Sequence, residues 1–316
     1  MFRIGDDMKL PDGKRFAFTV FDDADMGTVA NTRPVYDFLA DCGLRTTKST
    51  WVYPSRGEYA GQSLADADYR EWLLQLARTG FEIGLHNVGD GAFTREEIAA
   101  GLEEFRRTFG SYPKVHVNHV SNPDNVYWWA KRFEFPFNLL YTLAYYARTR
   151  RMPPAGGDNP RARHFWGDYC RDRITYVRNI TVNHINTLEK DRRMPYHIAS
   201  KPMVKYWFSS SDGHDLALFN NLIRKENVDA LEASGGVCIV YTHFAYGFVK
   251  NGEVDPTFRE RIEYLAGKDG WFVPVSTLLD HLVAAHGGED PGYLYRLRTN
   301  IDWCLDRVAK RMRFGI

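Results

Sequence analysis

Residues 15–23 join an apolar strand to two adjacent carboxylates, and this stretch constrains the fold more than any other. Five of the seven residues from Phe16 to Asp22 are aromatic or aliphatic, without Gly or Pro. That composition is typical of a parallel strand covered on both faces. Because successive strand residues point to opposite sides, we expect Asp22 and Asp23 to differ in role, one binding a metal and the other handling a proton. The alternative is that both are turn residues before Ala24–Gly27.

The same pattern recurs along the chain, with apolar strands alternating with helices. Strands are predicted at residues 46–53, 81–85, 115–120, 204–208, 236–242 and 271–275. Helices are predicted at residues 33–42, 66–79, 94–110, 217–231 and 276–282, the third opened by a capping box of Thr94 and Glu97. Polar residues gather where strands end. This order predicts an α/β fold, a parallel sheet or barrel with its site at the carboxyl rim.

Two segments depart from this regular order. From about residue 125 to 200 the periodicity is lost, and the Pro- and Gly-rich residues 152–157 cannot belong to one regular element. We interpret this segment as a long insertion over one mouth of a single domain spanning residues 1–316. A C-terminal helix is predicted at about residues 292–313. This helix and the aromatic, arginine-rich residues 127–151 are predicted to pack on the barrel, with peripheral membrane contact as the alternative and sugar binding as a further one for residues 127–151.

The overall composition excludes some classes of protein. Lysine and arginine number 41 against 40 aspartate and glutamate, so no basic surplus indicates nucleic-acid binding. The four cysteines are far apart and form no C-x-x-C pair, which argues against a disulfide framework or zinc knuckle. The first residues lack the apolar run of a signal peptide. We therefore expect a cytoplasmic protein, with the inner membrane surface as an alternative location, and predict no oligomeric state.

Ionisable side chains follow several of the predicted strands. His86 ends one strand, Asp90 follows it by four residues, and His243 ends another. Together with Asp23, His86 and Asp90 make a set of three ligands, the number that catalytic metal sites use while leaving a position for water. Two oxygens and one nitrogen suit zinc, iron, manganese or cobalt. The alternative for His86 alone is a hydrogen-bonded histidine at the rim.

These residues resemble the motifs of a known family, the polysaccharide deacetylases, a NodB-like group that includes chitin and peptidoglycan deacetylases. Residues 18–23, Phe-Thr-Val-Phe-Asp-Asp, are similar to its Thr-Phe-Asp-Asp-Gly motif. Residues 82–90 resemble its His-Ser/Thr-x-x-His motif, and residues 237–243 the late strand that ends in a histidine. The resemblance covers about residues 14–120 and 235–283. It implies a deformed (β/α) barrel of about seven strands and hydrolysis of an N-acetyl group on an amino sugar.

The resemblance also implies roles for individual residues. Asp22 would be the general base, Asp23 and His86 ligands of one divalent metal, with zinc first, and His243 the general acid. Asp90 stands where the family has its second ligand histidine. The family's Arg-x-Pro-Tyr motif is replaced by residues 115–119, which removes the arginine that would orient the base.

Four more residues are candidates for substrate contact. Strand alternation puts His116 and Asn118 on one face and His119 on the other, so one set is predicted to contact substrate or to complete the metal site. The alternative is that they are polar residues at a strand end. Trp207 is a counterpart of the aromatic residue in the family's fourth motif, or else a core residue.

The sequence therefore predicts a metal-dependent amino-sugar N-deacetylase in surface-polysaccharide biosynthesis. The predicted substrate is an N-acetylated sugar, a sugar nucleotide or a lipid-linked glycan. One alternative is a carbohydrate-binding protein on a barrel that has lost catalysis, since the arginine is missing and one histidine is replaced. Another is a different metal hydrolase with the same rim geometry.

Overall fold

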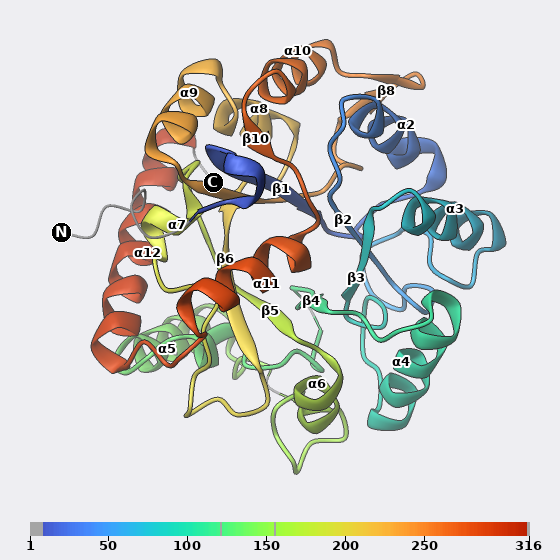
Figure 1. Ribbon diagram of the computed structural model, residues 1–316. Coiled ribbons are helices and arrows are strands. Elements are labelled where there is room, and N and C mark those ends of the chain that lie inside the picture. The colour runs from blue at the N-terminus through green and yellow to red at the C-terminus, as the bar shows by residue number, and fades with distance from the viewer. Residues whose placement is uncertain (1–8, 121, 155, 315–316) are drawn as a thin grey trace.

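The apolar runs of the sequence form seven parallel strands that close into a barrel in the computed structural model, which describes residues 9–120, 122–154 and 156–314 (Figure 1). The barrel strands are β1 (Phe16–Asp22), β2 (Thr47–Thr50), β3 (Glu82–His86), β4 (Val115–Val117), β5 (Tyr176–Val182), β6 (Tyr206–Asp212) and β7 (Val237–Thr242). Neighbours pair in sequence order, and β1 pairs with β7 to close the ring. The predicted fold class, a (β/α) barrel of about seven strands, is confirmed.

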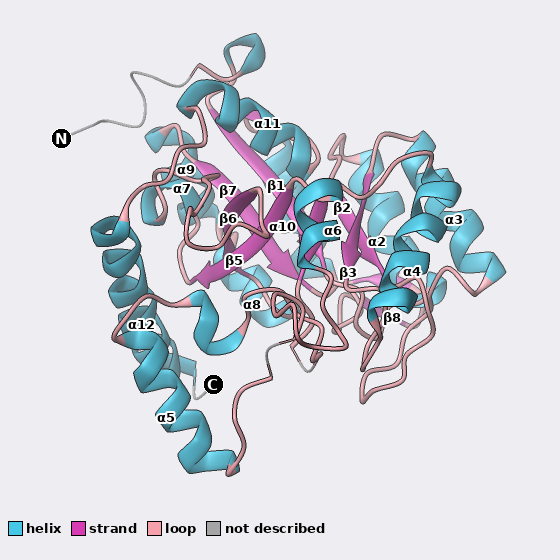
Figure 2. Cartoon of the chain, turned by 90° about the horizontal axis from the view of Figure 1, so that it is seen from below, coloured by secondary structure: helices cyan, strands magenta, loops and turns pink. Residues whose placement is uncertain are grey.

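Helices surround the barrel and shorter elements complete it (Figures 1 and 2). The helices are α2 (Val29–Asp41), α3 (Ala67–Arg78), α4 (Arg95–Phe109), α5 (Phe137–Thr149), α6 (Gly167–Arg173), α7 (Thr187–Lys190), α8 (Leu216–Leu222), α9 (Lys225–Ser234), α10 (Pro256–Ala266), α11 (Val275–His286) and α12 (Tyr293–Phe314). The shorter elements are the 3₁₀ turns η1 (Pro11–Gly13) and η2 (Trp129–Arg132), the hairpin β8 (Val249–Lys250) and β9 (Glu253–Val254), and β10 (Gly270–Trp271), which pairs with the start of β1. No helix in the described ranges is long and apolar enough to cross a membrane.

Local sequence signals explain the best-predicted elements. All seven residues of β1 are buried, as its apolar composition requires. The predicted capping box of α4 is present, because the Thr94 side chain accepts from the backbone of Glu97 and the Glu97 side chain accepts from that of Thr94. Gly110 then ends the helix at φ +81°, a conformation that favours glycine.

Four predicted elements are corrected by the structure. Helix α2 begins at Val29, capped by Thr28 rather than Thr32, and it contains Pro34 near its middle. Residues 217–231 form two helices, α8 and α9, instead of one. Only Gly270–Trp271 of the last predicted strand is extended, since Val275 already begins α11. The predicted insertion at 125–200 contains barrel strand β5, so it is not an addition outside the fold.

The two mouths of the barrel differ. On the amino side, α11 is fixed to the strand starts through Asp280, which pairs with Lys114 Nζ at 2.9 Å and accepts from Tyr176 Oη at 2.6 Å. On the carboxyl side, parallel strands bring their last residues to one rim. Asp22, His86 and Asp212 are the final residues of their strands there. The fold therefore gathers the ionisable side chains at the carboxyl mouth.

Candidate active site and metal centre

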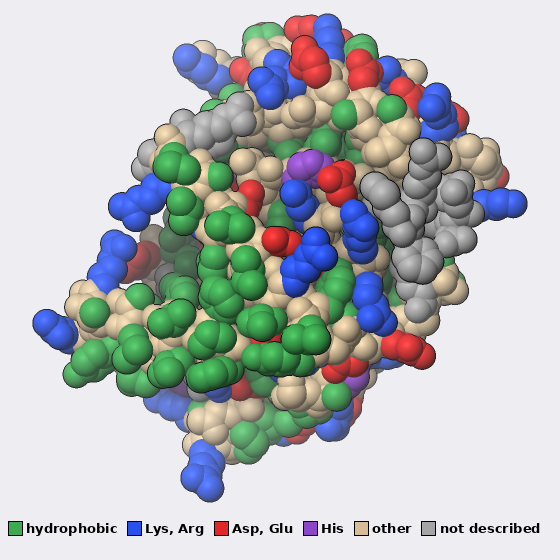
Figure 3. All heavy atoms as spheres, turned by 90° about the vertical axis from the view of Figure 1, so that its left-hand side faces the viewer, with side chains coloured by type: hydrophobic (Ala, Val, Ile, Leu, Met, Phe, Trp, Pro, Cys, Tyr) green, Lys and Arg blue, Asp and Glu red, His purple; other side chains and the backbone are tan. Residues whose placement is uncertain are grey.

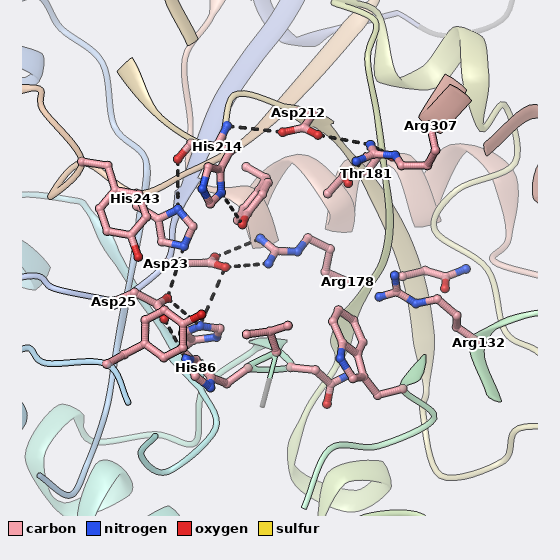
Figure 4. Close-up of a pocket in the computed structure, with 18 of the residues that line it drawn as sticks. Asp23, Asp25, His86, Arg132, Arg178, Thr181, Asp212, His214, His243 and Arg307 are labelled. Atoms are coloured by element: carbon pink, nitrogen blue, oxygen red, sulfur yellow. Dashed lines mark hydrogen bonds and ion pairs between the residues drawn. The ribbon is translucent and has the colours of Figure 1, made fainter. Parts of the chain in front are cut away.

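A pocket of about 560 Å³ opens at the carboxyl ends of the strands (Figure 4). Its inner end is lined by ionisable side chains from β1, β3, β4, β5 and β7 or the loops that follow them. These are Asp23, Asp25, His86, His119, Arg178 and His243. The predicted residues Asp23, His86 and His243 are thus brought together, as expected. Asp25 and Arg178 were not predicted.

The Asp25 carboxylate is the centre of this group. Three histidine Nε2 atoms face its oxygens, at 3.0 Å for His86, 2.7 Å for His119 and 3.3 Å for His243. Burial alone would raise the pKa of Asp25, but the three imidazoles hold it well below its usual range. Asp25 is therefore ionised, and its negatively charged carboxylate faces the three histidines.

The other ring nitrogen of each of these histidines, Nδ1, lies near a hydrogen-bond acceptor. His86 Nδ1 lies 3.2 Å from the Val117 carbonyl, and His243 Nδ1 lies 2.9 Å from the His214 carbonyl. His119 Nδ1 lies 3.2 Å from Asn122 Oδ1. A neutral imidazole has one N–H, so each ring that donates from Nδ1 presents a lone pair at Nε2.

This arrangement fits a divalent cation. Histidines that bind metals commonly donate their other N–H to a carbonyl or carboxylate, as the His86 ring can. The ligand atoms of Asp25, His86 and His119 lie within 4.8 Å of one another, and so do those of Asp23, Asp25 and His243. Without an ion, protonation must supply the positive charge. Burial would lower the pKa of His119, but hydrogen bonding and attraction to Asp25 raise it above its ordinary value.

Asp23 is held by an arginine rather than by the histidines. Arg178 donates from Nη1 and Nη2 to its two oxygens at 2.9 and 2.6 Å, and both side chains are buried (Figure 4). Burial would raise the pKa of Asp23, but the Arg178 guanidinium and then His86 lower it below its ordinary value. The sequence had suggested that the arginine orienting an acidic side chain was lost, yet β5 supplies one from within the predicted insertion.

The prediction that Asp22 is the general base is not supported by its position. Asp22 does not line the pocket. It pairs with Lys48 Nζ at 3.0 Å, accepts from Tyr36 Oη at 3.1 Å and accepts from the Phe244 amide at 2.8 Å. Asp22 and Lys48 are both fully buried. Adjacent strand residues point to opposite sides, and here Asp23 faces the pocket while Asp22 faces the helix layer.

Asp90 also takes a different position from the predicted one. It lies behind His119, with its Oδ1 3.4 Å from His119 Nδ1, and is absent from both groups of possible metal ligands among the described residues. Its other oxygen accepts from the Tyr59 amide at 2.7 Å and the Ser55 hydroxyl at 2.9 Å. Asp90 therefore lies next to His119 and outside the two groups of possible metal ligands.

Two of the four candidate substrate contacts lie outside the pocket and two line it. His116 is buried with its ring 5.1 Å from that of Trp166, and burial lowers its pKa to about 3. Trp207 is buried in the core. Asn118 and His119 line the pocket, although the Asn118 amide is occupied by the Val126 backbone at 2.9 and 3.0 Å.

The two missed residues carried signals in the sequence. Asp25 lies two positions after Asp23, the spacing at which side chains of an extended chain share a side. Residues 176–182, Tyr-Val-Arg-Asn-Ile-Thr-Val, are rich in β-branched residues, which indicates a strand. Arg178 stands in that strand. The irregular pattern of the surrounding residues, 125–200, masks this strand and its arginine in the sequence.

Comparisons with known proteins bear on the fold. No protein-family model and no curated protein sequence matches the chain. The solved structure of PuuE allantoinase matches with a TM-score of 0.51 and 12% identity, covering 88% of this chain and 93% of that one. Structures described as polysaccharide deacetylases from Mycobacterium smegmatis and Pseudomonas aeruginosa PAO1 have TM-scores of 0.47 and 0.49. Their identities are 14% and 11%, and they cover 87% and 88% of this chain and 92% and 94% of their own.

Structures described as polysaccharide deacetylases are thus among those to which this chain is similar. At such low identity, the allantoinase match shows the barrel fold alone. The chemistry has to be argued from the side chains at the rim.

Proposed function

We propose that the protein is a metal-dependent hydrolase that removes an N-acetyl group from an amino sugar. The observation that carries this proposal is the group of Asp25, His86 and His119, whose ligand atoms lie within 4.8 Å of one another in the pocket. One carboxylate and two imidazoles suit Zn²⁺ first, with Fe²⁺, Mn²⁺ or Co²⁺ as alternatives. Such a cation, when bound, lowers the pKa of coordinated water and polarises a carbonyl oxygen.

In this proposal Asp23 is the general base. Its lowered pKa keeps it ionised at neutral pH, and the two hydrogen bonds from Arg178 fix the plane of the carboxylate. Asp23 and His243 place atoms within 4.8 Å of each other, so both face the same reacting group. As a water oxygen attacks the acetyl carbon, Asp23 accepts the proton that the water releases.

His243 is the general acid. Burial would lower its pKa, but its hydrogen bond to Asp25 and the charge of Asp23 raise it above the ordinary value, which favours the protonated ring that a general acid needs. The His214 carbonyl, 2.9 Å from Nδ1, holds the ring with Nε2 toward the pocket. His243 donates the Nε2 proton to the sugar nitrogen as the carbon–nitrogen bond breaks, which yields acetate and a free amine.

The wall of the pocket supports a sugar as the substrate. Its aromatic side chains are Tyr59, Trp128, Tyr241, Tyr246 and Trp303. Aromatic faces pack well on the apolar faces of sugar rings while their polar atoms remain available for hydrogen bonds. With the motif resemblance, this favours a glycan intermediate of surface-polysaccharide assembly as the physiological substrate.

Acetate release and metal content, measured together, test the proposal. We expect the purified protein to bind one divalent metal and to release acetate from an N-acetylated amino sugar. Asp25→Asn should lose both metal and turnover. Asp23→Asn should keep the metal and lose turnover by about 10²- to 10⁴-fold, the range for removing a general base. Asp37→Asn, on an aspartate whose side chain is 63% exposed on α2, is the matched control and should behave as wild type.

Two results would contradict the proposal. Metal-free protein that binds N-acetylated sugars and releases no acetate would instead support the carbohydrate-binding alternative. Normal turnover in the Asp23→Asn variant would remove Asp23 from the chemistry.

A further inference from the structure

An apolar surface covers one side of the molecule, over helices α5 and α12 (Figure 3). Fourteen large hydrophobic side chains are exposed among the described residues, and twelve of them lie within residues 135–152 or 293–312. Examples are Leu139, Leu140 and Leu143 on α5, which are 50–57% exposed, and Leu294, Leu305 and Met312 on α12, which are 63–79% exposed. Contiguous apolar patches of this kind mark interaction sites. We call this surface the α5–α12 face.

The α5–α12 face is joined to the rest of the fold through α12. Helix α5 lies near α12 in Figures 1 and 2, and the ring of Phe133, which precedes α5, is 4.9 Å from the ring of Trp303 on α12. Helix α12 is fixed to the barrel through Asp212, which pairs with Arg307 at 3.1 Å and Lys310 at 2.9 Å. The exposed apolar side chains of α12 therefore stand on a helix that is fixed to the barrel.

The charges around the face have one predominant sign. Residues 135–152 contain no Asp or Glu, and Arg148, Arg150 and Arg151 are exposed at their end. On α12, Arg298 and Arg311 are exposed and Asp302 is the exposed acid in the part of the helix whose side chains are described. An amphipathic surface with arginines at its margin is typical of a segment that lies in the interface of an anionic bilayer.

We propose that the α5–α12 face rests on a membrane surface that contains anionic lipid. A second copy of the chain is disfavoured as the occupant, because a two-fold contact would bring the five exposed arginines of both copies into one interface, with Asp302 as the exposed acid of each α12 in its described part. Helix α12 also reaches the pocket, since its Trp303, Arg307 and Lys310 line it. On the proposed function, docking would thus hold the pocket beside lipid headgroups, where a lipid-linked glycan is presented.

Vesicle flotation tests this docking without reference to catalysis. Wild-type protein should float with vesicles of phosphatidylcholine and phosphatidylglycerol, and bind far less to phosphatidylcholine alone. The variant Leu140→Ser/Leu143→Ser/Leu305→Ser should bind at least about tenfold less, because each leucine contributes apolar area to the contact. The charge variant Arg148→Gln/Arg150→Gln/Arg151→Gln should also lose binding.

The matched control for the charge variant changes exposed arginines on other helices. The variant Arg78→Gln/Arg107→Gln/Arg171→Gln alters α3, α4 and α6 and should float as wild type. Wild-type protein that stays with neither vesicle type would overturn the proposal. So would a dimer that the leucine variant dissociates, in protein that does not float, because a second copy would then be the occupant.

A different observation, the charge of the outer pocket, supports a second inference. Arg132, Arg307 and Lys310 line this end, and two carboxylates pair with them in the described part of the chain: Asp212 with Arg307 and Lys310, and Asp306 with Arg307 at 3.6 Å. Arg178 is already neutralised by Asp23. The outer end therefore carries more positive than negative charge.

Among these cations, Arg132 has the fewest carboxylate partners in the described parts of the chain. No ion pair joins it to a carboxylate in the described parts of the chain, and its guanidinium stacks at 3.7 Å on the Trp128 ring. Burial, with added repulsion from Arg178 and Arg307, lowers its pKa to about 9. Figure 4 shows the Arg132 and Arg178 side chains extending toward the same cavity. An anionic ligand there would supply the missing partner.

We infer that the outer pocket binds an anionic group, a phosphate or a carboxylate, attached to the sugar whose N-acetyl group lies at Asp25. This inference rests on the proposed function for the position of the sugar. Arginine suits either anion because its planar donors match two oxygens at once.

Calorimetric titration distinguishes the two anions and is independent of turnover. The probes are N-acetylglucosamine, its 1-phosphate and an N-acetylated aminouronic acid. We expect one charged probe to bind at least about tenfold tighter than the neutral sugar, and Arg132→Gln to remove that advantage while Arg132→Lys restores part of it. Arg78→Gln is the control. Equal affinity for all three probes, or unchanged binding by Arg132→Gln, would overturn the inference even if acetate release were confirmed.

Discussion

The position of Asp22 can be tested by separating its effect on stability from its effect on turnover. The structure pairs its carboxylate with Lys48 at 3.0 Å, with both side chains fully buried. Burial lowers the pKa of Lys48, but attraction to Asp22 more than offsets this, so the ammonium is charged. The perturbation is a set of three variants: Asp22→Asn, Lys48→Met and the double variant. A structural pair predicts lost stability, whereas a general base predicts lost turnover.

The expected loss of stability is large because each single variant leaves a buried polar partner without its counter-charge. Breaking a buried ion pair by removing one partner costs about 3–5 kcal/mol. Unfolding entropy is about 2.1 cal/mol/K per residue, or about 0.7 kcal/mol/K for 316 residues. The melting temperature should therefore fall by about 4–7 °C in each single variant. The double variant should be about 2–3 kcal/mol less destabilised than the sum of the two.

Urea denaturation and thermal melting measure these differences, and acetate release measures turnover on the same samples. Asp37→Asn is the control for removing a charge, because that aspartate is exposed on α2. If Asp22→Asn melted as wild type, kept its metal and lost turnover, the sequence-based role of Asp22 as base would be right. The assignment of Asp22 to a structural ion pair with Lys48 would then be wrong.

Three further variants test neighbouring parts of the site. Arg178→Lys keeps the charge beside Asp23 but cannot form both hydrogen bonds, so turnover in the acetate assay should fall by about tenfold to a hundredfold with metal content unchanged. Asp90→Ala should weaken metal affinity by about tenfold to a hundredfold in a competition titration, since it removes an outer partner of His119. His116 has its folded pKa lowered to about 3, so its contribution to stability is present above the unfolded value of about 6.5 and is lost as pH falls below it. Urea denaturation measures this: below about pH 6.5, the free energy of unfolding of wild type should fall by about 1.4 kcal/mol more per pH unit than that of His116→Gln.

Elements with a strong local signal could be predicted from the sequence. Strand β1 is apolar at five of its seven positions, and the ends of α4 are set by Thr94, Glu97 and Gly110, which lie in the helix or directly beside it. In both cases the residues that decide the structure lie next to one another. The same holds for the gathering of His86 and His243 at one rim, because parallel strands require it.

The details of the site depended on contacts between distant residues. Strand alternation predicted that Asp22 and Asp23 face opposite sides, but not which of them faces the pocket. That choice follows from their cations, Lys48 on β2 and Arg178 on β5, which lie 26 and 155 positions away. Sequence spacing cannot reveal such pairs. The prediction that Asp90 is a metal ligand is not supported, for the same reason. The loop after β4 places His119 beside Asp90, and His119 rather than Asp90 lines the pocket.

The balance of charge at the rim indicates which carboxylate needs a cation from outside the protein. Asp22 is compensated by Lys48 on the helix side of the barrel, and Asp23 by Arg178 on the pocket side. Asp25 has no lysine or arginine within ion-pair distance among the described residues, and only histidines face it. Neutral histidines provide lone pairs but no charge, so either protons or a metal ion must balance Asp25. One protonated imidazole would balance the charge and leave the lone pairs of the other two rings unused, whereas a divalent cation would use these lone pairs as ligands. The acidic group omitted from the sequence-based assignment is thus the one with the strongest physical reason to bind the metal.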